Sequence, residues 1–121
     1  MANEIEMTAR LYASKNGASI NPQTFTTTVN MTGTDMGQNT QDIGSGADEL
    51  LDIAADLSLP YKVLIYNMDL QNAVYVGVST PYQFQIPAGE FMLIPRVDSN
   101  LYLRSVISGS TVKIFAQFCE I

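Results

Sequence analysis

Apolar and polar residues alternate along most of this chain, and a period of two is the pattern of a half-buried β-strand. Near the N-terminus, four apolar residues keep this spacing: Ile5, Met7, Ala9 and Leu11. Similar runs return about every 10 residues with turn residues between them, which is typical of a β-sandwich or barrel. The sequence therefore predicts an all-β fold, an antiparallel β-sandwich of the jelly-roll-like kind.

The expected strands are separated by residues that favour turns. Lys15-Asn16-Gly17 should end the first strand, because Asn and Gly tolerate positive φ. Further strands are expected at Thr24–Met31, Val63–Tyr66, Val74–Val78, Tyr82–Ile86, Phe91–Ile94, Leu101–Val106 and Val112–Phe118. A chain of 121 residues has the size of one domain, so a single sandwich over 1–121 is expected.

Two of these strands allow a more specific prediction. Val63–Tyr66 is a continuous apolar run, which is typical of a central strand covered on both faces. A polar turn at 67–72 connects it to Val74–Val78, so the two strands are expected to form a hairpin. Phe91–Ile94 is expected to stop at Pro95, because proline cannot donate a hydrogen bond to a strand ladder.

Two segments depart from the alternation. Between Ala47 and Leu57 apolar residues fall at a helical spacing, with Ser45 as a candidate cap, so one short helix near 47–57 is predicted and an irregular strand is the alternative. The passage from Gly33 to Gly46 is the longest polar stretch. It is expected to form a mobile loop or an arm.

The residue types needed for most catalysis are missing. The chain has no histidine and a single cysteine, Cys119, which removes the commonest general base, the commonest metal ligand and every His-activated nucleophile. We therefore expect no enzyme activity, no catalytic residue, no metal and no cofactor. Cys119 is expected to be a small buried or interface residue.

Charge and hydropathy exclude further classes. There are 12 acidic and 6 basic residues, a net charge of −6, and the basic residues are scattered, so a nucleic-acid partner is not expected. The N-terminus lacks the basic and apolar regions of a signal peptide, and no apolar run approaches the roughly 20 residues of a membrane span. We expect synthesis in the cytoplasm and no membrane partner.

Acidic residues gather in one part of the sequence: Asp42, Asp48, Glu49, Asp52 and Asp56. A solvated acidic surface is the favoured interpretation, because no apolar pocket surrounds them in sequence. A calcium site with hard oxygen ligands is the alternative, although the order of the residues is not that of an EF-hand loop.

Three tyrosines fall opposite the main apolar stripes: Tyr12, Tyr75 and Tyr102. Exposed aromatic residues are common at protein interfaces. Packing against a neighbouring subunit is the favoured interpretation, and a carbohydrate-binding surface is the alternative.

Gly33 is followed by four passages in a fixed order: Thr40-Gln41-Asp42-Ile43-Gly44, Val63-Leu64-Ile65-Tyr66-Asn67-Met68-Asp69, Asn72-Ala73-Val74-Tyr75-Val76-Gly77 and Ile86-Pro87-Ala88-Gly89-Glu90. In this order they resemble small virion proteins of tailed bacteriophages, and the resemblance runs from about residue 33 to the end. It implies a jelly-roll-like sandwich used as a capsid or tail component in many copies, and it implies no catalytic residues.

The function expected from these observations is that of a bacteriophage virion structural protein, a capsid decoration or cement subunit made in the host cytoplasm. Its expected partners are itself, as a trimer or other homo-oligomer, and the major capsid protein or other virion proteins. A neck, tail or fibre-attachment subunit and a carbohydrate- or receptor-binding module are the alternatives. The interface should lie on the arm Glu4–Tyr12 and on Gly33–Gly46, with these candidate residues: Ile5, Met7, Tyr12, Met36, Gln41, Tyr75 and Tyr102.

Overall fold

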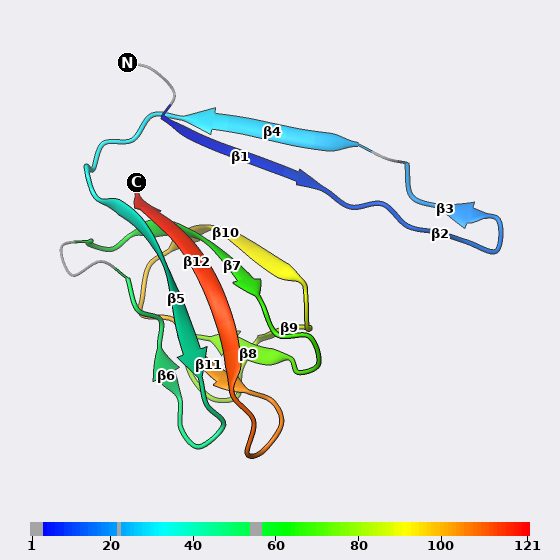
Figure 1. Ribbon diagram of the computed structural model, residues 1–121. Helices are drawn as coiled ribbons and strands as arrows, with labels where there is room; N and C mark the ends of the chain where they lie inside the picture. The colour runs from blue at the N-terminus through cyan, green and yellow to red at the C-terminus, as the bar shows by residue number, and fades with distance from the viewer. Residues whose placement is uncertain (1–3, 22, 54–56) are drawn as a thin grey trace. The chain divides into compact units, whose positions relative to one another are not determined.

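The computed structural model describes residues 4–21, 23–53 and 57–121, and in these residues the chain is all-β without a helix (Figure 1). The all-β prediction is confirmed. The chain divides into two compact units, Met1–Thr32 and Gly33–Ile121, and each is described by itself. A single domain over 1–121 stays a prediction.

The first unit contains a long β-ribbon made of four strands. Strand β1 (Ile5–Arg10) pairs antiparallel with β4 (Thr24–Val29), and β2 (Ser14–Lys15) pairs with β3 (Ala18–Ser19). Between Lys15 and Ala18, Asn16 and Gly17 have φ values of 52° and 81°. Positive φ at both central residues is the type I′ turn, whose twist matches that of a hairpin. The predicted turn at Lys15–Gly17 is confirmed.

The two faces of the ribbon differ in polarity. Along β1 and β4 one face pairs Ile5 with Val29, Met7 with Thr27 and Ala9 with Phe25. The opposite face carries Glu6, Thr8, Arg10 and three threonines. Phe25 remains 65% exposed on the apolar face. A two-stranded ribbon is marginally stable alone in water, so this face is suited to packing against another surface.

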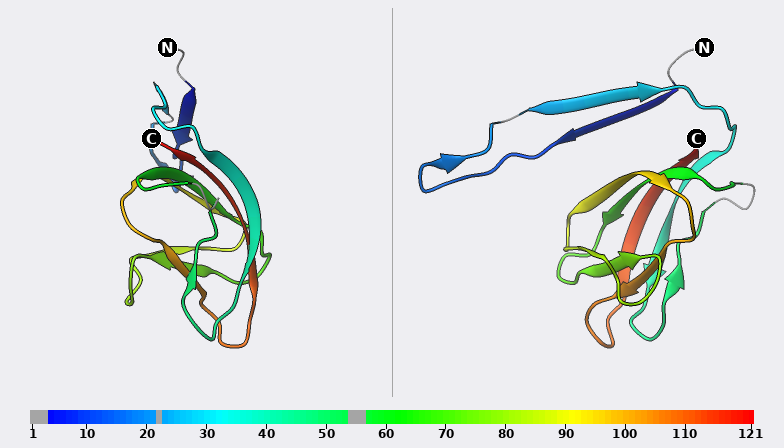
Figure 2. Two further views of the ribbon diagram at one scale, coloured as in Figure 1. Left: turned by 90° about the vertical axis from the view of Figure 1, so that its left-hand side faces the viewer. Right: turned by 180° about the vertical axis from the view of Figure 1, so that it is seen from behind.

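The second unit consists of two four-stranded antiparallel sheets (Figure 2). The first sheet has the order β10-β7-β12-β5 and the second has the order β6-β11-β8-β9. The strands of the first sheet are β5 (Met36–Ile43), β7 (Tyr61–Asn67), β10 (Phe91–Val97) and β12 (Val112–Glu120). Those of the second sheet are β6 (Glu49–Leu50), β8 (Val74–Gly77), β9 (Phe84–Ile86) and β11 (Tyr102–Ser105).

These eight strands pair in a nested order. The first pairs with the last (β5 with β12), and β6 with β11, β7 with β10 and β8 with β9 follow inward. Such nesting arises when one long hairpin is rolled into two layers, and it defines the jelly roll. The predicted jelly-roll-like sandwich is therefore confirmed for residues 33–121.

The core lies between the two sheets. Both sheets contribute the side chains on the inner side of their strands, as the period-two pattern requires. Its fully buried members include Ile43, Val63, Ile65, Val74, Val76, Ile86, Leu103, Val112, Ile114 and Ala116. Burying a side chain of this kind stabilises the fold by roughly 1.5–3 kcal/mol, so this layer is the main source of stability.

The predicted hairpin of Val63–Tyr66 with Val74–Val78 is wrong. β7 lies in the first sheet and β8 in the second, so residues 68–73 cross between the sheets. The buried Asn67 organises the crossing: its Nδ2 donates to Asn72 O at 2.9 Å and Ile86 O at 3.0 Å, and its Oδ1 accepts from Asp69 N at 2.9 Å. The polar run read as a hairpin turn is thus an inter-sheet corner.

The helix predicted near 47–57 is also wrong where the structure describes it, since residues 47–53 contain no helix and include the short strand β6; residues 54–56 lie outside the described residues. Pairing with β11 forms this strand, and the Gln41 side chain adds two further bonds to the backbone. Its Nε2 donates to Leu50 O and its Oε1 accepts from Asp52 N, both at 2.9 Å. One amide thereby substitutes for a neighbouring strand, because it satisfies backbone groups that a helix would have paired internally.

The passage Gly33–Gly46 is not a loop or an arm. Residues 36–43 form β5, which pairs with β12 along its whole length. Its side chains are mostly polar because β5 is an edge strand whose outer face meets solvent, and charged or polar residues protect such edges. The polar composition of this passage therefore did not predict the strand that the structure shows.

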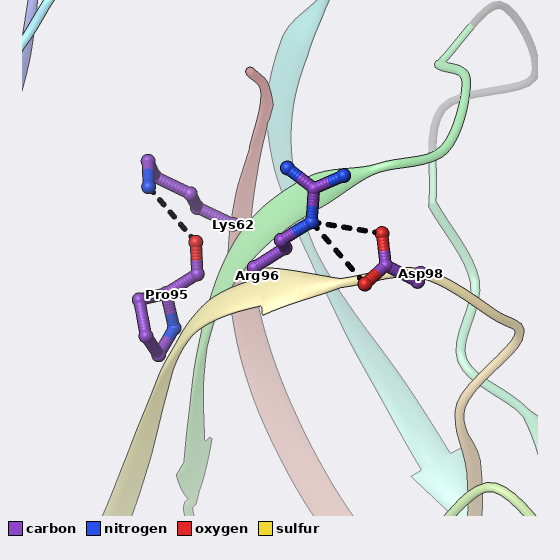
Figure 3. A network of polar contacts seen from close by, with 4 residues as sticks. All are labelled: Lys62, Pro95, Arg96 and Asp98. Atoms are coloured by element: carbon purple, nitrogen blue, oxygen red, sulfur yellow. Dashed lines mark hydrogen bonds and ion pairs between the residues drawn. The ribbon is translucent and has the colours of Figure 1, made fainter.

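Strand β10 continues past Pro95 to Val97, contrary to the expected stop. Its register with β7 shifts between Ile94 and Val97, and proline is tolerated at such a bulge on an edge strand. The Pro95 carbonyl accepts a hydrogen bond from Lys62 Nζ at 2.8 Å (Figure 3). The Lys62 side chain thus satisfies a backbone carbonyl at the point where the hydrogen-bond ladder between β7 and β10 is irregular.

Glu120 joins three segments of the second unit. Its Oε1 accepts from the backbone N–H of Thr34 (3.1 Å) and Asp35 (3.3 Å), and its Oε2 accepts from Ser58 N and Oγ, both at 2.9 Å. A Cβ on Gly33 would lie 2.6 Å from the Glu120 Cβ, so this close approach requires glycine. The bonds from Ser58, followed by that from Asp35, lower the pKa of Glu120.

We expect this carboxylate to make the fold sensitive to acid. Because its pKa is lowered in the folded state, its stabilisation is present above the ordinary value of 4.5 and is lost as the pH falls through the lowered pKa. The melting temperature of the wild type should therefore fall more steeply below about pH 4.5 than that of Glu120→Gln, whose side chain cannot ionise. Parallel melting-temperature curves for the two proteins would contradict this role.

Candidate interaction surface

The outer face of the first sheet carries a continuous row of aromatic side chains. Phe91 on β10 lies opposite Tyr66 on β7, and Tyr66 lies opposite Phe115 on β12. Phe91 is 66% exposed and Tyr66 39% exposed, and Phe115 is half-buried. We call this set, with its apolar neighbours below, the outer apolar face.

Aliphatic and sulfur-containing residues extend the row along the sheet. Leu93 and Leu64 form the next cross-strand pair, both half-buried. On β12 and β5 the exposed polar pair Gln117 and Gln38 comes next. Beyond this pair, Cys119 lies opposite Met36 of β5, which is 62% exposed. Burial raises the pKa of the Cys119 thiol, so the thiol stays protonated and behaves as a small apolar group.

Charged residues lie at the edges of this face. Arg96 Nε donates to both Asp98 carboxylate oxygens, at 2.9 and 3.2 Å, close to Lys62 (Figure 3). Lys113 and Asp42 approach to 3.9 Å on β12 and β5. Exposed pairs of this kind contribute little stability. An apolar centre with a polar rim is the usual anatomy of a protein interface.

The central strand of this sheet is apolar on both of its sides. Val63–Tyr66 is apolar on both sides, and the core covers only Val63 and Ile65. The other side, Leu64 and Tyr66, remains partly open to solvent. A strand of this composition normally has both faces covered, so the sequence pattern and the exposure together make this side of the sheet a candidate interaction surface.

The predicted interface residues fall in three places. Ile5, Met7 and Tyr12 belong to the ribbon, where Ile5 is buried, Met7 half-buried and Tyr12 52% exposed. Met36 is on the outer apolar face, while Tyr75 and Tyr102 lie half-buried on the outer side of the second sheet. Gln41 bonds to the backbone at residues 50 and 52. Their role at an interface stays a prediction.

Sequence reasoning missed the aromatic row itself. The signal was present in the apolar runs 63–66 and 91–94, which have no polar alternation. Burial within one domain accounts for such a run equally well. Only the sheet order shows that the second side of these strands faces outward.

A second cluster lies on the outer side of the second sheet. Tyr75 on β8 and Tyr82 stack with ring centroids 5.3 Å apart and planes inclined by 7°. The Asp48 carboxylate accepts hydrogen bonds from Tyr82 OH and from Thr80 Oγ1 (3.1 Å), and Arg104 Nη1 lies 3.5 Å from it. The bond from Tyr82, with those from Thr80 and Arg104, lowers the pKa of Asp48; burial and this bond raise the pKa of Tyr82 to about 12.

The structure does not bring the acidic residues of 42–56 together. Asp42 faces Lys113, Asp48 faces Tyr82, and Glu49 Oε2 accepts from Gly44 N; Asp56 lies outside the described residues. Among the residues that the structure describes, no group of three acidic or cysteine side chains could hold a metal.

No protein-family model, curated protein or solved structure matches this chain. In the described part of the chain no helix could cross a membrane. The interpretation of the surfaces therefore depends on their geometry and chemistry.

Proposed function

We propose that this protein is a structural subunit of a tailed-bacteriophage virion, in the first place a decoration or cement subunit that stabilises the head. The outer apolar face is the single observation that carries the proposal. A row of three aromatic side chains with flanking Leu and Met residues has the composition of an interface core. Phe91, Tyr66 and Met36 keep 66%, 39% and 62% of their surface exposed.

The occupant that we propose for this face is a second copy of the chain, with the major capsid protein as the further partner. An aromatic side chain buries 150–250 Å² when fully covered, so the exposed parts of the row and its neighbours amount to roughly 400 Å². A stable interface needs about 800 Å² from each partner. The face alone is therefore too small, and each copy needs a further contact.

The β-ribbon supplies a suitable second contact. Its apolar face is exposed at Phe25, and its β1 and β4 strands each have one edge without a strand partner among the described strands. Open edges and apolar ribbon faces both support addition to another protein's sheet. Several modest contacts repeated over many copies bind tightly through avidity, which is the situation of a cement subunit on a capsid.

The first test is the mass of the purified protein by light scattering, at a few micromolar and again after tenfold dilution. We expect a closed oligomer, such as a trimer, at both concentrations. A monomer at both would overturn self-association as the use of the outer apolar face.

The second test is co-sedimentation with empty phage heads assembled without this chain. We expect saturable binding and a higher temperature of head disruption. Binding to tails or necks instead would move the subunit within the virion, as in the alternative of a neck, tail or fibre-attachment subunit. Failure to sediment with any virion part would overturn the proposed function.

A further inference from the structure

A surface pocket of about 590 Å³ lies beside the stacked tyrosines of the second sheet. Its lining includes Ser45, Tyr75, Thr80, Tyr82, Arg104 and Ser108. The volume is in the range that holds small-molecule ligands. The lining combines two aromatic rings with hydroxyl groups and a guanidinium, and it lies on the sheet opposite the outer apolar face.

The charges around the pocket balance. Arg104 faces the Asp48 carboxylate at 3.5 Å, and Asp48 also accepts hydrogen bonds from Tyr82 and Thr80. An anionic ligand would meet a neutralised arginine on a protein of net charge −6. A cationic ligand would compete with Arg104 and the two hydroxyl groups for the Asp48 carboxylate. The electrostatics therefore favour an uncharged ligand.

The polar groups indicate a ligand rich in hydroxyls. Ser108 is exposed, and the Ser45 hydroxyl, which accepts from Gly109 N at 2.7 Å, keeps its own proton to donate. Arg104 Nε donates to Ser45 O at 2.8 Å, which holds the guanidinium in place with its remaining N–H groups as donors. Flat aromatic rings next to fixed donors match a molecule with apolar C–H faces and polar edges.

We propose that this pocket binds a neutral saccharide. One sugar ring lies against the tyrosine pair, and its hydroxyls bond to Arg104, Ser45 and Ser108. The bonds from Tyr82 and Thr80 to Asp48 hold the 80–82 segment over the sheet and so form one wall of the site. This inference does not depend on the proposed assembly function, because the pocket and the outer apolar face lie on different sheets.

The test is a titration of the ¹⁵N-labelled protein with methyl glycosides of glucose, galactose, mannose and N-acetylglucosamine, followed by amide chemical shifts. We expect at least one glycoside to shift amides at residues 45, 75, 82, 104 and 108 in a saturable way. Ser108→Gln should place a larger neutral side chain at the mouth and weaken binding by about tenfold or more. Ser14→Gln, the same change on the exposed ribbon, should have no effect.

Two variants of Tyr82 separate the contribution of its ring to binding from that of its hydroxyl. Tyr82→Phe keeps the stacked ring but loses the bond to Asp48, whereas Tyr82→Ala loses both, so Tyr82→Ala should weaken binding about tenfold beyond Tyr82→Phe. No shift with any glycoside at 20 mM, or shifts that survive Ser108→Gln unchanged, would overturn the proposal. The cluster would then serve only to clamp the 80–82 segment.

Discussion

Asn67→Ala is expected to destabilise the second unit by about 3 kcal/mol. The substitution leaves the Asn72 and Ile86 carbonyls and the Asp69 N–H without their side-chain partner, and each unpaired buried group costs about 1–3 kcal/mol. Partial access of water to the corner reduces the sum. Urea unfolding followed by circular dichroism measures the change.

The neighbouring Met68→Ala serves as the control for Asn67→Ala. Met68 is 42% exposed, and its replacement should change stability by no more than about 0.5 kcal/mol. If Asn67→Ala cost less than about 1 kcal/mol, the polar corner would not be the element that holds the crossing between the sheets.

Phe91→Asp is expected to abolish self-association while the monomer stays folded. The side chain is 66% exposed in the single chain, so a carboxylate there remains hydrated until a partner covers it. The substitution removes an aromatic anchor, and association would bury the new charge. Together these effects cost at least about 2 kcal/mol of binding free energy and weaken association roughly thirtyfold or more. Light scattering across a dilution series measures the effect.

Leu50→Asp is the matched control for Phe91→Asp. Leu50 is 49% exposed on the second sheet, where it pairs with Tyr102. Its replacement by Asp introduces the same charge at a similarly exposed apolar position away from the outer apolar face. We expect it to leave the oligomer intact. Equal losses from both variants would show that association responds to net charge and does not use the aromatic row.

The local elements of this fold could be predicted with good accuracy. The Asn16-Gly17 turn, the strands near Ile5 and Thr24 and the long closing strand β12 all appear where the alternation placed them. Each depends on interactions within a few residues: positive φ in a turn or the period of two in a strand. Such features are determined by residues that are close together in the sequence.

The errors share one cause, which is that distant partners decide between local alternatives. Residues 36–43 form a strand because β12 pairs with them. Glu49–Leu50 form a strand because β11 pairs with them, and the Gln41 amide bonds to the backbone of Leu50 and Asp52. Val63–Tyr66 and Val74–Val78 separate into different sheets because the pairings are nested. Each of these partners lies nine or more residues away in sequence.

The candidate surfaces show the same division. The sequence by itself determined an acidic chain without histidine, with strands in a sandwich and more apolar side chains in 63–66 and 91–94 than one covered face requires. Only the tertiary structure decided that Phe91, Tyr66 and Phe115 form one exposed row, and that Tyr75 and Tyr82 stack beside Asp48 and Arg104. The physical reason is that the strand period specifies to which side a residue points, whereas strand order and register decide which residues become its neighbours.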